Sequence, residues 1–348
     1  MIPRYTLSNG YSLARIIKGG WHLAGDHGTI DSQQAIQDMA RFVEAGITTF
    51  DCADIYTGVE QLIGDFRRAH PSLAARVQIH TKFVPDLSDL HAIDGRYVER
   101  IIDRSLQRLG VERLDLVQFH WWDYNIPHYV ETALQLDHLR RAGKIAQIGI
   151  TNFDTQRLGE LVSAGVPIVS HQVQYSLLDD RPAAGMIDYC RAHDIVLLCY
   201  GTVAGGFLSE RWLGKAEPHR ADITNRSLVK YKLIIEDFGG WDLFQALLRT
   251  LAQIAAKHQT DIASVASRAI LDRQQVAAVI VGATNASHLG AHARVASLQL
   301  GNDDRAAIAT VTHRREGPQG DVYTLERDRT GRHGQIMKYE LNQGSAKK

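Results

Sequence analysis

The sequence has few cysteines, no excess of charge and no long apolar run, and each absence excludes a class of protein. Cys52, Cys190 and Cys199 are an odd number without CxxC spacing, which argues against a zinc ribbon or a secreted disulfide framework. Thirty-nine Lys and Arg balance thirty-nine Asp and Glu, so there is no basic field to bind nucleic acid or an anionic membrane. Apolar runs such as 277–283 are far too short to span a bilayer.

Targeting and metal-binding patterns are also missing. The opening residues, MIPRYTLSNG, lack the apolar core of a secretory signal. No HxH pair or carboxylate cluster supplies three metal ligands. We therefore expect a soluble, cytoplasmic protein whose ligand is a small molecule, with no metal, nucleic-acid or membrane partner. Composition leaves its state, monomer or homo-oligomer, undetermined.

What the sequence does contain is an alternation of short apolar runs with longer amphipathic stretches such as 32–45 and 97–109. The GxGxxG fingerprint of a doubly wound sheet is absent after the first run. Eight strand–helix units match a parallel (β/α)8 TIM barrel in number and size, which we expect to be one domain over residues 1–312. The predicted strands are Ile16–Gly20, Ile47–Asp51, Val77–Lys82, Leu114–His120, Ile145–Asn152, Ile168–Gln172, Ile195–Tyr200 and Val276–Val281.

Two appendages flank the predicted barrel. Asn9-Gly10 between two alternating runs indicates an N-terminal β-hairpin. Residues 313–348 form a charged extension, in which Val322–Glu326 and Gln335–Leu341 alternate with period two. This pattern predicts a second hairpin, docked on the barrel at the substrate mouth or, as the alternative, on a partner subunit.

Polar residues end six of the predicted strands. Because parallel strands all point the same way, these ends should meet on one rim, where the active sites of such barrels lie. The six residues are Asp51, Lys82, His120, Asn152, Gln172 and Tyr200.

The rim carries the groups that carbonyl reduction needs. Tyr56, five residues after Asp51, can turn its hydroxyl over the strand end. The ammonium of Lys82 should make the phenol a better proton donor, and Asp51 should keep Lys82 charged. His120 could orient the oxygen on which negative charge develops.

Taken together, these motifs resemble the aldo-keto reductase superfamily over nearly the whole barrel. The resemblance implies that Tyr56 is the general acid, that Lys82 and Asp51 tune it, and that His120 positions the carbonyl. The matching motifs are Phe50–Tyr56, Thr81-Lys82, Phe119-His120, Gly143–Phe153, Gln172–Tyr175 and Cys199-Tyr200.

The same resemblance implies a nicotinamide cofactor, NADP(H) or NAD(H). Thr151, Asn152 and Gln172 match positions that hold the carboxamide, and Tyr200 matches the aromatic residue that stacks on the ring. At the adenosine end the chain departs from the pattern: Gly282, Ala291 and His292 stand where many relatives have a basic residue and a Glu-Asn pair, so NADH is as open as NADPH. The remaining expected cofactor contacts are Gly20, Trp21, Gly201, Gly282, Asn285 and His288.

Aromatic residues after the first and fourth strands should form the substrate wall. Trp21, His22, Trp121 and Trp122 offer flat faces and a few polar groups, which suit a flat or sugar-like carbonyl or alcohol. The segment 201–240 is long enough to cover cofactor or substrate.

Two other functions remain possible on the same barrel. A Schiff-base aldolase would use Lys82 as its nucleophile, but such a lysine must be neutral, and Asp51 favours the cation. A regulatory barrel would bind the nucleotide without turnover, and the complete set of four rim residues argues against it.

Overall fold

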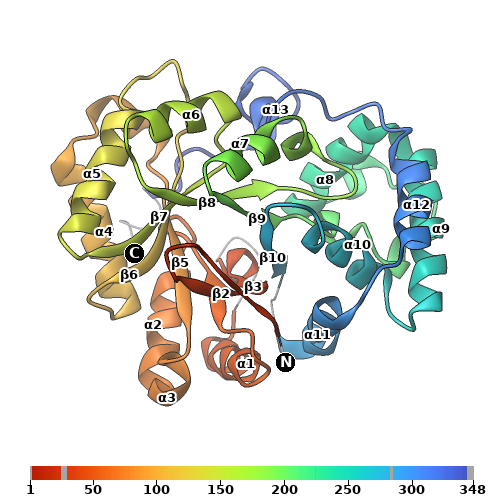
Figure 1. Ribbon diagram of the computed structural model, residues 1–348, viewed down its shortest axis with the longest axis horizontal. Helices are drawn as coiled ribbons and strands as arrows, with labels where there is room; N and C mark the ends of the chain where they lie inside the picture. The colour runs from red at the N-terminus through yellow and green to blue at the C-terminus, as the bar shows by residue number, and fades with distance from the viewer. Residues whose placement is uncertain (1, 25–29, 224, 283–284, 343–348) are drawn as a thin grey trace.

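Eight parallel strands close into a barrel in the computed structural model, as the sequence predicts (Figure 1). The structure describes residues 2–24, 30–223, 225–282 and 285–342. The barrel order is β10-β3-β4-β5-β6-β7-β8-β9, so that the first and last strands are neighbours. The strands are β3 (Ile16–Gly19), β4 (Thr49–Asp51), β5 (Gln78–Phe83), β6 (Leu114–Phe119), β7 (Ile145–Thr151), β8 (Ile168–Gln174), β9 (Val196–Tyr200) and β10 (Val276–Gly282).

The register of the strands aligns their polar residues at one end of the barrel. Asp51 is opposite His80, Lys82 is opposite Gln118, and Thr151 is opposite Gln172. Neighbours in a parallel sheet point to the same face, so the polar strand ends form a layer at the C-terminal end of the barrel.

Helices pack around the barrel and complete its main core. Several begin at an acidic or amide side chain that accepts hydrogen bonds from the first turn, as Asp31, Asp94, Asp154, Asn225 and Asp261 do. The helices are α1 (Ser32–Glu44), α2 (Val59–Ala69), α3 (Pro71–Ala74), α4 (Gly95–Leu109), α5 (Tyr129–Arg141), α6 (Thr155–Ser163), α7 (Met186–Ala192), α8 (Arg226–Phe238), α9 (Gly240–Lys257), α10 (Ile262–Leu271), α11 (Leu289–Ser297) and α12 (Asn302–Thr312). Within the described ranges, no helix combines the length and apolar character needed to cross a membrane.

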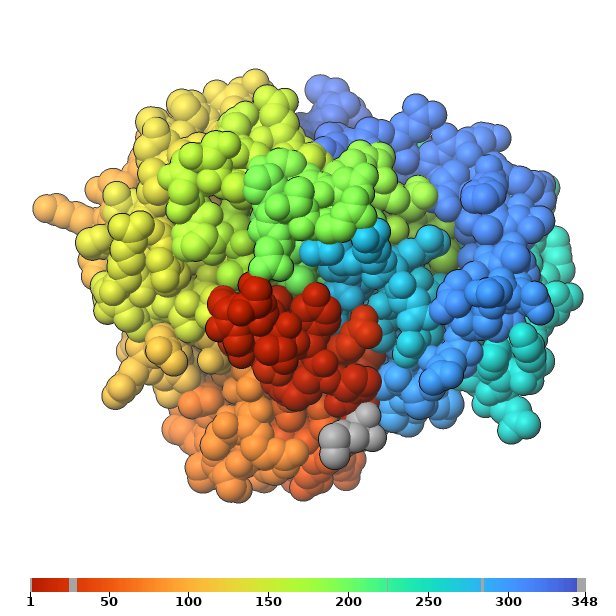
Figure 2. Space-filling model, in the orientation of Figure 1, coloured from red at the N-terminus to blue at the C-terminus, as the bar shows by residue number. Residues whose placement is uncertain are grey.

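The predicted N-terminal hairpin is present and closes the floor of the barrel. Strands β1 (Arg4–Thr6) and β2 (Ser12–Ala14) pair antiparallel. Leu7 and Leu13 of the hairpin pack with Ile17, Leu116 and other residues of the barrel strands in a second apolar cluster. The hairpin, in red, lies across the centre of the face shown in Figures 1 and 2. The hairpin therefore covers an apolar layer inside the floor of the barrel, whereas the opposite rim carries the polar strand ends.

The predicted C-terminal hairpin is wrong. In place of strands, the described part of the extension contains one helical turn, α13 (Thr324–Arg327), and a 3-10 turn at Gly334–Ile336. Val322, Tyr323 and Glu326 are all buried, so the burial follows helical spacing and not the alternation that the sequence indicates. Glu326 can be buried because Arg181 neutralises it across the fold, which no local pattern reveals.

The extension lies against the barrel over much of its length. The Leu87 amide donates to the Tyr339 carbonyl, and the amides of Leu341 and Asn342 donate to the Asp86 carboxylate. The extension thus contacts the loop that follows β5. Residues 343–348 lie outside the described residues.

Candidate active site

A buried ion pair forms the centre of the rim. Lys82 donates from Nζ to Asp51 Oδ2 at 2.7 Å and to the Cys52 carbonyl at 2.8 Å. Each of the two side chains is 5% exposed. Burial, the largest single effect, would lower the pKa of Lys82, but the charge and hydrogen bond of Asp51, together with Tyr56 and Cys52, outweigh it and raise that pKa above its ordinary value. The lysine is therefore a fixed cation.

Two glutamine amides also bind the Asp51 carboxylate. Gln172 donates to Oδ1 at 2.6 Å and Gln118 donates to the same oxygen at 3.0 Å. Gln172 donates to the Gln118 side-chain oxygen as well, at 3.0 Å. Gln118 is missing from the residues predicted from sequence, although it lies two residues before His120, and a period of two puts both on one strand face.

Tyr56 lies beside the ion pair, on the turn after β4. The Lys82 ammonium is 4.7 Å from the centre of the Tyr56 ring, and Trp21 packs edge-on against that ring at 5.0 Å. Burial raises the pKa of Tyr56, and Lys82 only partly opposes this. This corrects the expectation of a more acidic phenol: the ammonium limits the rise without reversing it. Tyr56 thus holds its proton at neutral pH.

His120 is fixed by the backbone of the next strand. Its Nδ1 lies 3.0 Å from the Thr151 carbonyl oxygen. A carbonyl can only accept, so Nδ1 carries the proton and the neutral ring presents the Nε2 lone pair to the rim. Nε2 is buried and has no hydrogen-bond partner in the described part of the chain. Burial and the nearby Arg327 charge lower the pKa of His120 to about 3, which keeps the ring neutral.

The residues predicted to hold a nicotinamide carboxamide lie together. Tyr200 donates to Asn152 Oδ1 at 2.8 Å, and the Asn152 amide donates to the Gln172 carbonyl at 3.0 Å. Asn152 has a left-handed backbone, with φ of 60°. Within the described residues, the Asn152 Nδ2 group and the Thr151 hydroxyl make no hydrogen bond. These two donors remain available to a ligand beside the Tyr200 ring.

Two of the predicted glycines occupy places that no side chain could share. A Cβ on Gly20 would lie 2.7 Å from the Asp51 carbonyl oxygen. A Cβ on Gly201, where φ is +76°, would lie 2.2 Å from the Tyr231 hydroxyl. Gly282 is the last residue of β10. A Cβ on Gly282 would lie 3.0 Å from Cε1 of the His22 ring. The end of β10 and the loop after β3 therefore meet at the rim.

The predicted aromatic wall divides into two parts. Trp21 and His22 are half-buried at the rim, and Trp122 packs edge-on against His120 with ring centres 4.4 Å apart. Trp121, by contrast, is fully buried, and its indole donates to carbonyls of its own loop, Asp123 and Ile126. Trp121 is therefore not on the rim surface; its buried ring packs under the loop after β6, which contains Asp123 and Ile126.

The predicted adenosine contacts lie at the far end of the rim. Asn285 and His288 are exposed, and Asn285 Oδ1 accepts from the Ser287 amide at 2.9 Å. His292 is turned inward beside Phe42, with ring centres 6.1 Å apart. No Lys or Arg occurs from Gly282 to His292.

The C-terminal extension brings residues to the rim that sequence reasoning missed. Tyr323 packs edge-on against His120 with ring centres 5.6 Å apart. Lys230 of α8 lies 5.3 Å from the centre of the Tyr200 ring and 5.6 Å from that of Tyr323. The long 201–240 segment and the extension therefore cover the rim together. The false strand pattern at 322–326 hid this arrangement.

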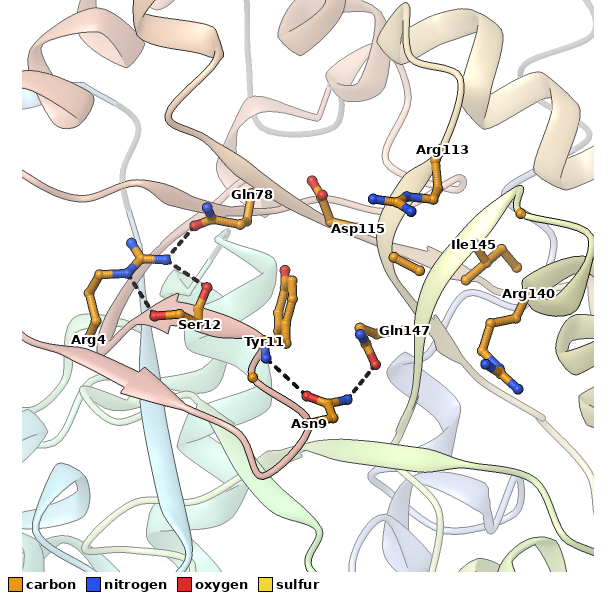
Figure 3. Close-up of a pocket in the computed structure, with 13 residues that line it drawn as sticks. Arg4, Asn9, Tyr11, Ser12, Gln78, Arg113, Asp115, Arg140, Ile145 and Gln147 are labelled. Carbon is orange, nitrogen blue, oxygen red and sulfur yellow. Dashed lines mark hydrogen bonds between the residues drawn. The ribbon is translucent and has the colours of Figure 1, made fainter.

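A separate cavity of about 590 Å³ opens at the floor of the barrel (Figure 3). Arg4 donates there to Ser12 and Gln78, and Asn9 links Tyr11 to Gln147. These residues belong to the hairpin and to the first residues of strands. The cavity is thus at the opposite end from the predicted site and includes none of its residues.

Neither a metal nor a disulfide contributes to the described structure. The described residues contain no group of three or more His, Cys, Asp or Glu side chains that could hold a metal ion. All three cysteines are buried and unpaired.

Comparison with known proteins identifies the class. A model of the aldo/keto reductase family matches residues 15–312, and the chain belongs to this family of oxidoreductases. It is 31% identical over 299 residues to flagellar radial spoke protein 5 of Chlamydomonas reinhardtii, a match that covers 69% of this chain and 56% of that protein. It is 27% identical over 305 residues to L-glyceraldehyde 3-phosphate reductase of Escherichia coli K12, covering 82% and 85% of the two chains. The fold is similar to that of a glycerol dehydrogenase from Gluconobacter oxydans, with a TM-score of 0.76, 21% identity and coverage of 92% and 97%.

Proposed function

We propose that this protein transfers a hydride between a nicotinamide cofactor and a small carbonyl or alcohol substrate, with Tyr56 as the proton donor and acceptor. The observation that carries the proposal is the buried Lys82–Asp51 pair, 2.7 Å long, whose ammonium lies 4.7 Å from the Tyr56 ring. A fixed cation beside a buried phenol stabilises the phenolate that remains when the proton leaves.

The proton chemistry follows from this arrangement. In the reductive direction the Tyr56 hydroxyl donates to the substrate oxygen, and Lys82 stabilises the resulting phenolate. Asp51 keeps Lys82 charged and in place, and Gln118 and Gln172 hold Asp51. In the oxidative direction the same groups accept the proton from the alcohol.

The rim residues fit a nicotinamide. Bound there, the group would supply or accept the hydride. The unengaged Asn152 Nδ2 and Thr151 hydroxyl, with Gln172, would hold its carboxamide, and Tyr200 would present an aromatic face. Gly20 and Gly201 pack against Asp51 and Tyr231, so a side chain at either position would displace the neighbouring rim residues. Gly282, Asn285 and His288 would face the adenosine end, where the lack of a basic residue supports use of either NADPH or NADH.

His120 points to the substrate class. A neutral imidazole with its proton on Nδ1 can only accept at Nε2, so it suits a hydroxyl group of the substrate better than the reacting carbonyl oxygen. A hydroxyl next to the reacting carbon, as in a hydroxyaldehyde or sugar, would satisfy this buried acceptor. Trp21, His22 and Trp122 would contact the rest of such a substrate.

The alternatives are less compatible with the site. A Schiff-base lysine must be neutral, whereas the charge of Asp51 raises the pKa of Lys82. Borohydride should therefore trap no substrate adduct on Lys82. A regulatory barrel without turnover would not need the ion pair to contact Tyr56.

A substrate panel tests the proposal. Oxidation of NADPH and NADH is measured with glyceraldehyde and glycolaldehyde, and with 3-hydroxypropionaldehyde and acetaldehyde as matched analogues that lack the hydroxyl next to the reacting carbon. The hydroxyaldehydes should have kcat/KM values about 10-fold to 100-fold higher, because an analogue leaves His120 Nε2 buried without a partner. Equal values would refute the role of His120. Absence of turnover with either cofactor across aldehydes, ketones and sugars would refute the proposed function.

A further inference from the structure

Arg327, the last residue of α13, connects the two loops that carry the site. Nη1 donates to the carbonyls of Trp121 and Trp122, the second at 2.8 Å. Nη2 donates to the Tyr124 hydroxyl at 2.8 Å and to the Asn152 carbonyl at 2.6 Å. One guanidinium group therefore joins the loop after His120 to the residue after β7. A planar fork with donors in fixed directions can make these four bonds, and a lysine cannot.

The residue that Arg327 holds is under backbone strain. Asn152 has φ of 60°, which costs free energy in a residue with a side chain. Its amide donates to Gln172, its side-chain oxygen accepts from Tyr200, and its carbonyl accepts from Arg327. Without the hydrogen bond from Arg327, the left-handed conformation of Asn152 would lose one of three supporting hydrogen bonds. The side-chain amide of Asn152 would then turn away from the rim.

Arg327 also acts on His120 through its charge. The guanidinium lowers the pKa of His120, second in effect only to burial. Tyr323, from the same turn, packs against the His120 ring. The extension thus favours the neutral form of His120 and limits the ring's movement.

The turn that carries Arg327 is anchored deep in the fold. Arg181 donates to both carboxylate oxygens of Glu326, at 3.1 and 3.2 Å, and to Asp179 at 2.8 and 2.9 Å. Arg181 and Glu326 have side chains no more than 2% exposed. Such anchoring fits a fixed part of the structure better than a mobile cover. The turn itself lies beyond residue 312, where the match to the family ends, whereas its partners Arg181, Trp122 and Asn152 lie within the matched barrel.

We infer that Arg327 is a positioning residue of the active site, which holds Asn152 and His120 in their working geometry from outside the family-matched barrel. This inference rests on the proposed function for its kinetic test but not for its spectroscopic test. The extension is then a part that completes the site.

The first test is kinetic and uses Arg327→Ala, Arg327→Lys and Arg327→Met. Arg327→Met should lower kcat about 100-fold, because small displacements of positioning groups have effects of this size. Arg327→Lys keeps the charge without the fork and should recover only part of kcat. Added guanidinium ion should raise the kcat of Arg327→Ala and leave the wild type unchanged. Arg329→Met is the matched control, since Arg329 is exposed and, among the described residues, its side chain bonds only to Asp123, at 3.4 Å; its kcat should equal that of the wild type.

The second test follows His120 itself by NMR of histidine labelled at Cε1, with His120→Gln to assign the signal. The pKa of His120 should rise in Arg327→Met, because the guanidinium lowers it in the wild type, and should stay unchanged in Arg329→Met. Failure of the wild type to turn over would refute the proposed function, while this titration would still test the role of Arg327. An unchanged kcat in Arg327→Lys, or an unmoved His120 titration in a folded Arg327→Met, would overturn the inference. If Arg327→Met does not fold, the lysine variant and guanidinium rescue decide the question.

Discussion

Removing one partner of the Asp51–Lys82 pair should destabilise the protein strongly. Each side chain is 5% exposed, so the remaining group would be a buried charge without its counter-ion. Breaking a buried pair in this way costs about 3–5 kcal/mol. With an unfolding entropy of about 2.1 cal/mol/K per residue over 348 residues, this corresponds to a fall in Tm of about 4–7 °C.

A double-mutant cycle separates this coupling from ordinary packing loss. Asp51→Asn and Lys82→Met should each lose about 3–5 kcal/mol of unfolding free energy, measured by thermal or urea unfolding. The double variant should be at least about 2 kcal/mol more stable than the sum of the two single losses predicts. The control is the surface pair Lys144–Asp103, whose side chains are 30% and 50% exposed. Its coupling should stay below about 1 kcal/mol.

The pH dependence gives a second signature of the pair. In the wild type the pKa of Lys82 is raised above 10.5, the ordinary value that it has in the unfolded chain. The charged Lys82 therefore stabilises the folded protein fully below pH 10.5, and this contribution is lost only at higher pH. In Asp51→Asn, burial lowers that pKa below the unfolded value, so the unfolded chain binds more protons. Its stability should therefore rise between pH 7 and pH 9. An additive cycle, or a flat pH dependence in Asp51→Asn, would refute the account of the pair.

Three further predictions concern the cofactor, a glycine and the buried extension. Because no basic residue occurs from Gly282 to His292, fluorescence titration should show less than a thousandfold preference, or about 4 kcal/mol, between NADPH and NADH, and a larger preference would reveal a missed phosphate site. Gly20→Ala should lose about 1–3 kcal/mol of unfolding free energy in urea, since its Cβ would lie 2.7 Å from the Asp51 carbonyl oxygen. Gly290→Ala in α11, whose Cβ would meet no atom closer than 3.7 Å, should gain about 0.5–1 kcal/mol. Equal effects of the two substitutions would contradict the packing argument. Although burial opposes it, Arg181 and Lys230 lower the pKa of Glu326 to about 2. The Glu326 carboxylate should therefore contribute about 3 kcal/mol to the loss of wild-type stability as the pH drops from 4.5 toward 2, and acid unfolding of Glu326→Gln should show a loss smaller by that amount.

The barrel and its rim could be predicted because their signals are local. Each strand is an apolar run that ends in a polar residue, and parallel strands bring such ends together by topology alone. The burial of Trp121 and the raised pKa of Tyr56 could not be predicted in this way. Both depend on how deeply a side chain is covered by parts of the chain that are distant in sequence.

The secondary structure of the extension was predicted wrongly for a related reason. Residues 322–326 alternate in polarity, but Glu326 counts as polar in a sequence and is buried in the fold by Arg181, 145 positions earlier. Arg327 gives no local signal either, because its partners are mostly backbone carbonyls. Gln118 could have been found, since it shares a strand face with His120.

The most direct test of the proposed chemistry is isotope transfer from a reduced cofactor that carries deuterium at both C4 positions of the nicotinamide. Glyceraldehyde is incubated with the labelled cofactor and either wild type or Tyr56→Phe, and the product is analysed by mass spectrometry. Wild type should place deuterium on the former carbonyl carbon, and Tyr56→Phe should do so at least about 100-fold more slowly while binding the cofactor with unchanged affinity. Unlabelled product from the wild type would contradict hydride transfer from the cofactor, and equal rates in the two proteins would contradict the assignment of Tyr56.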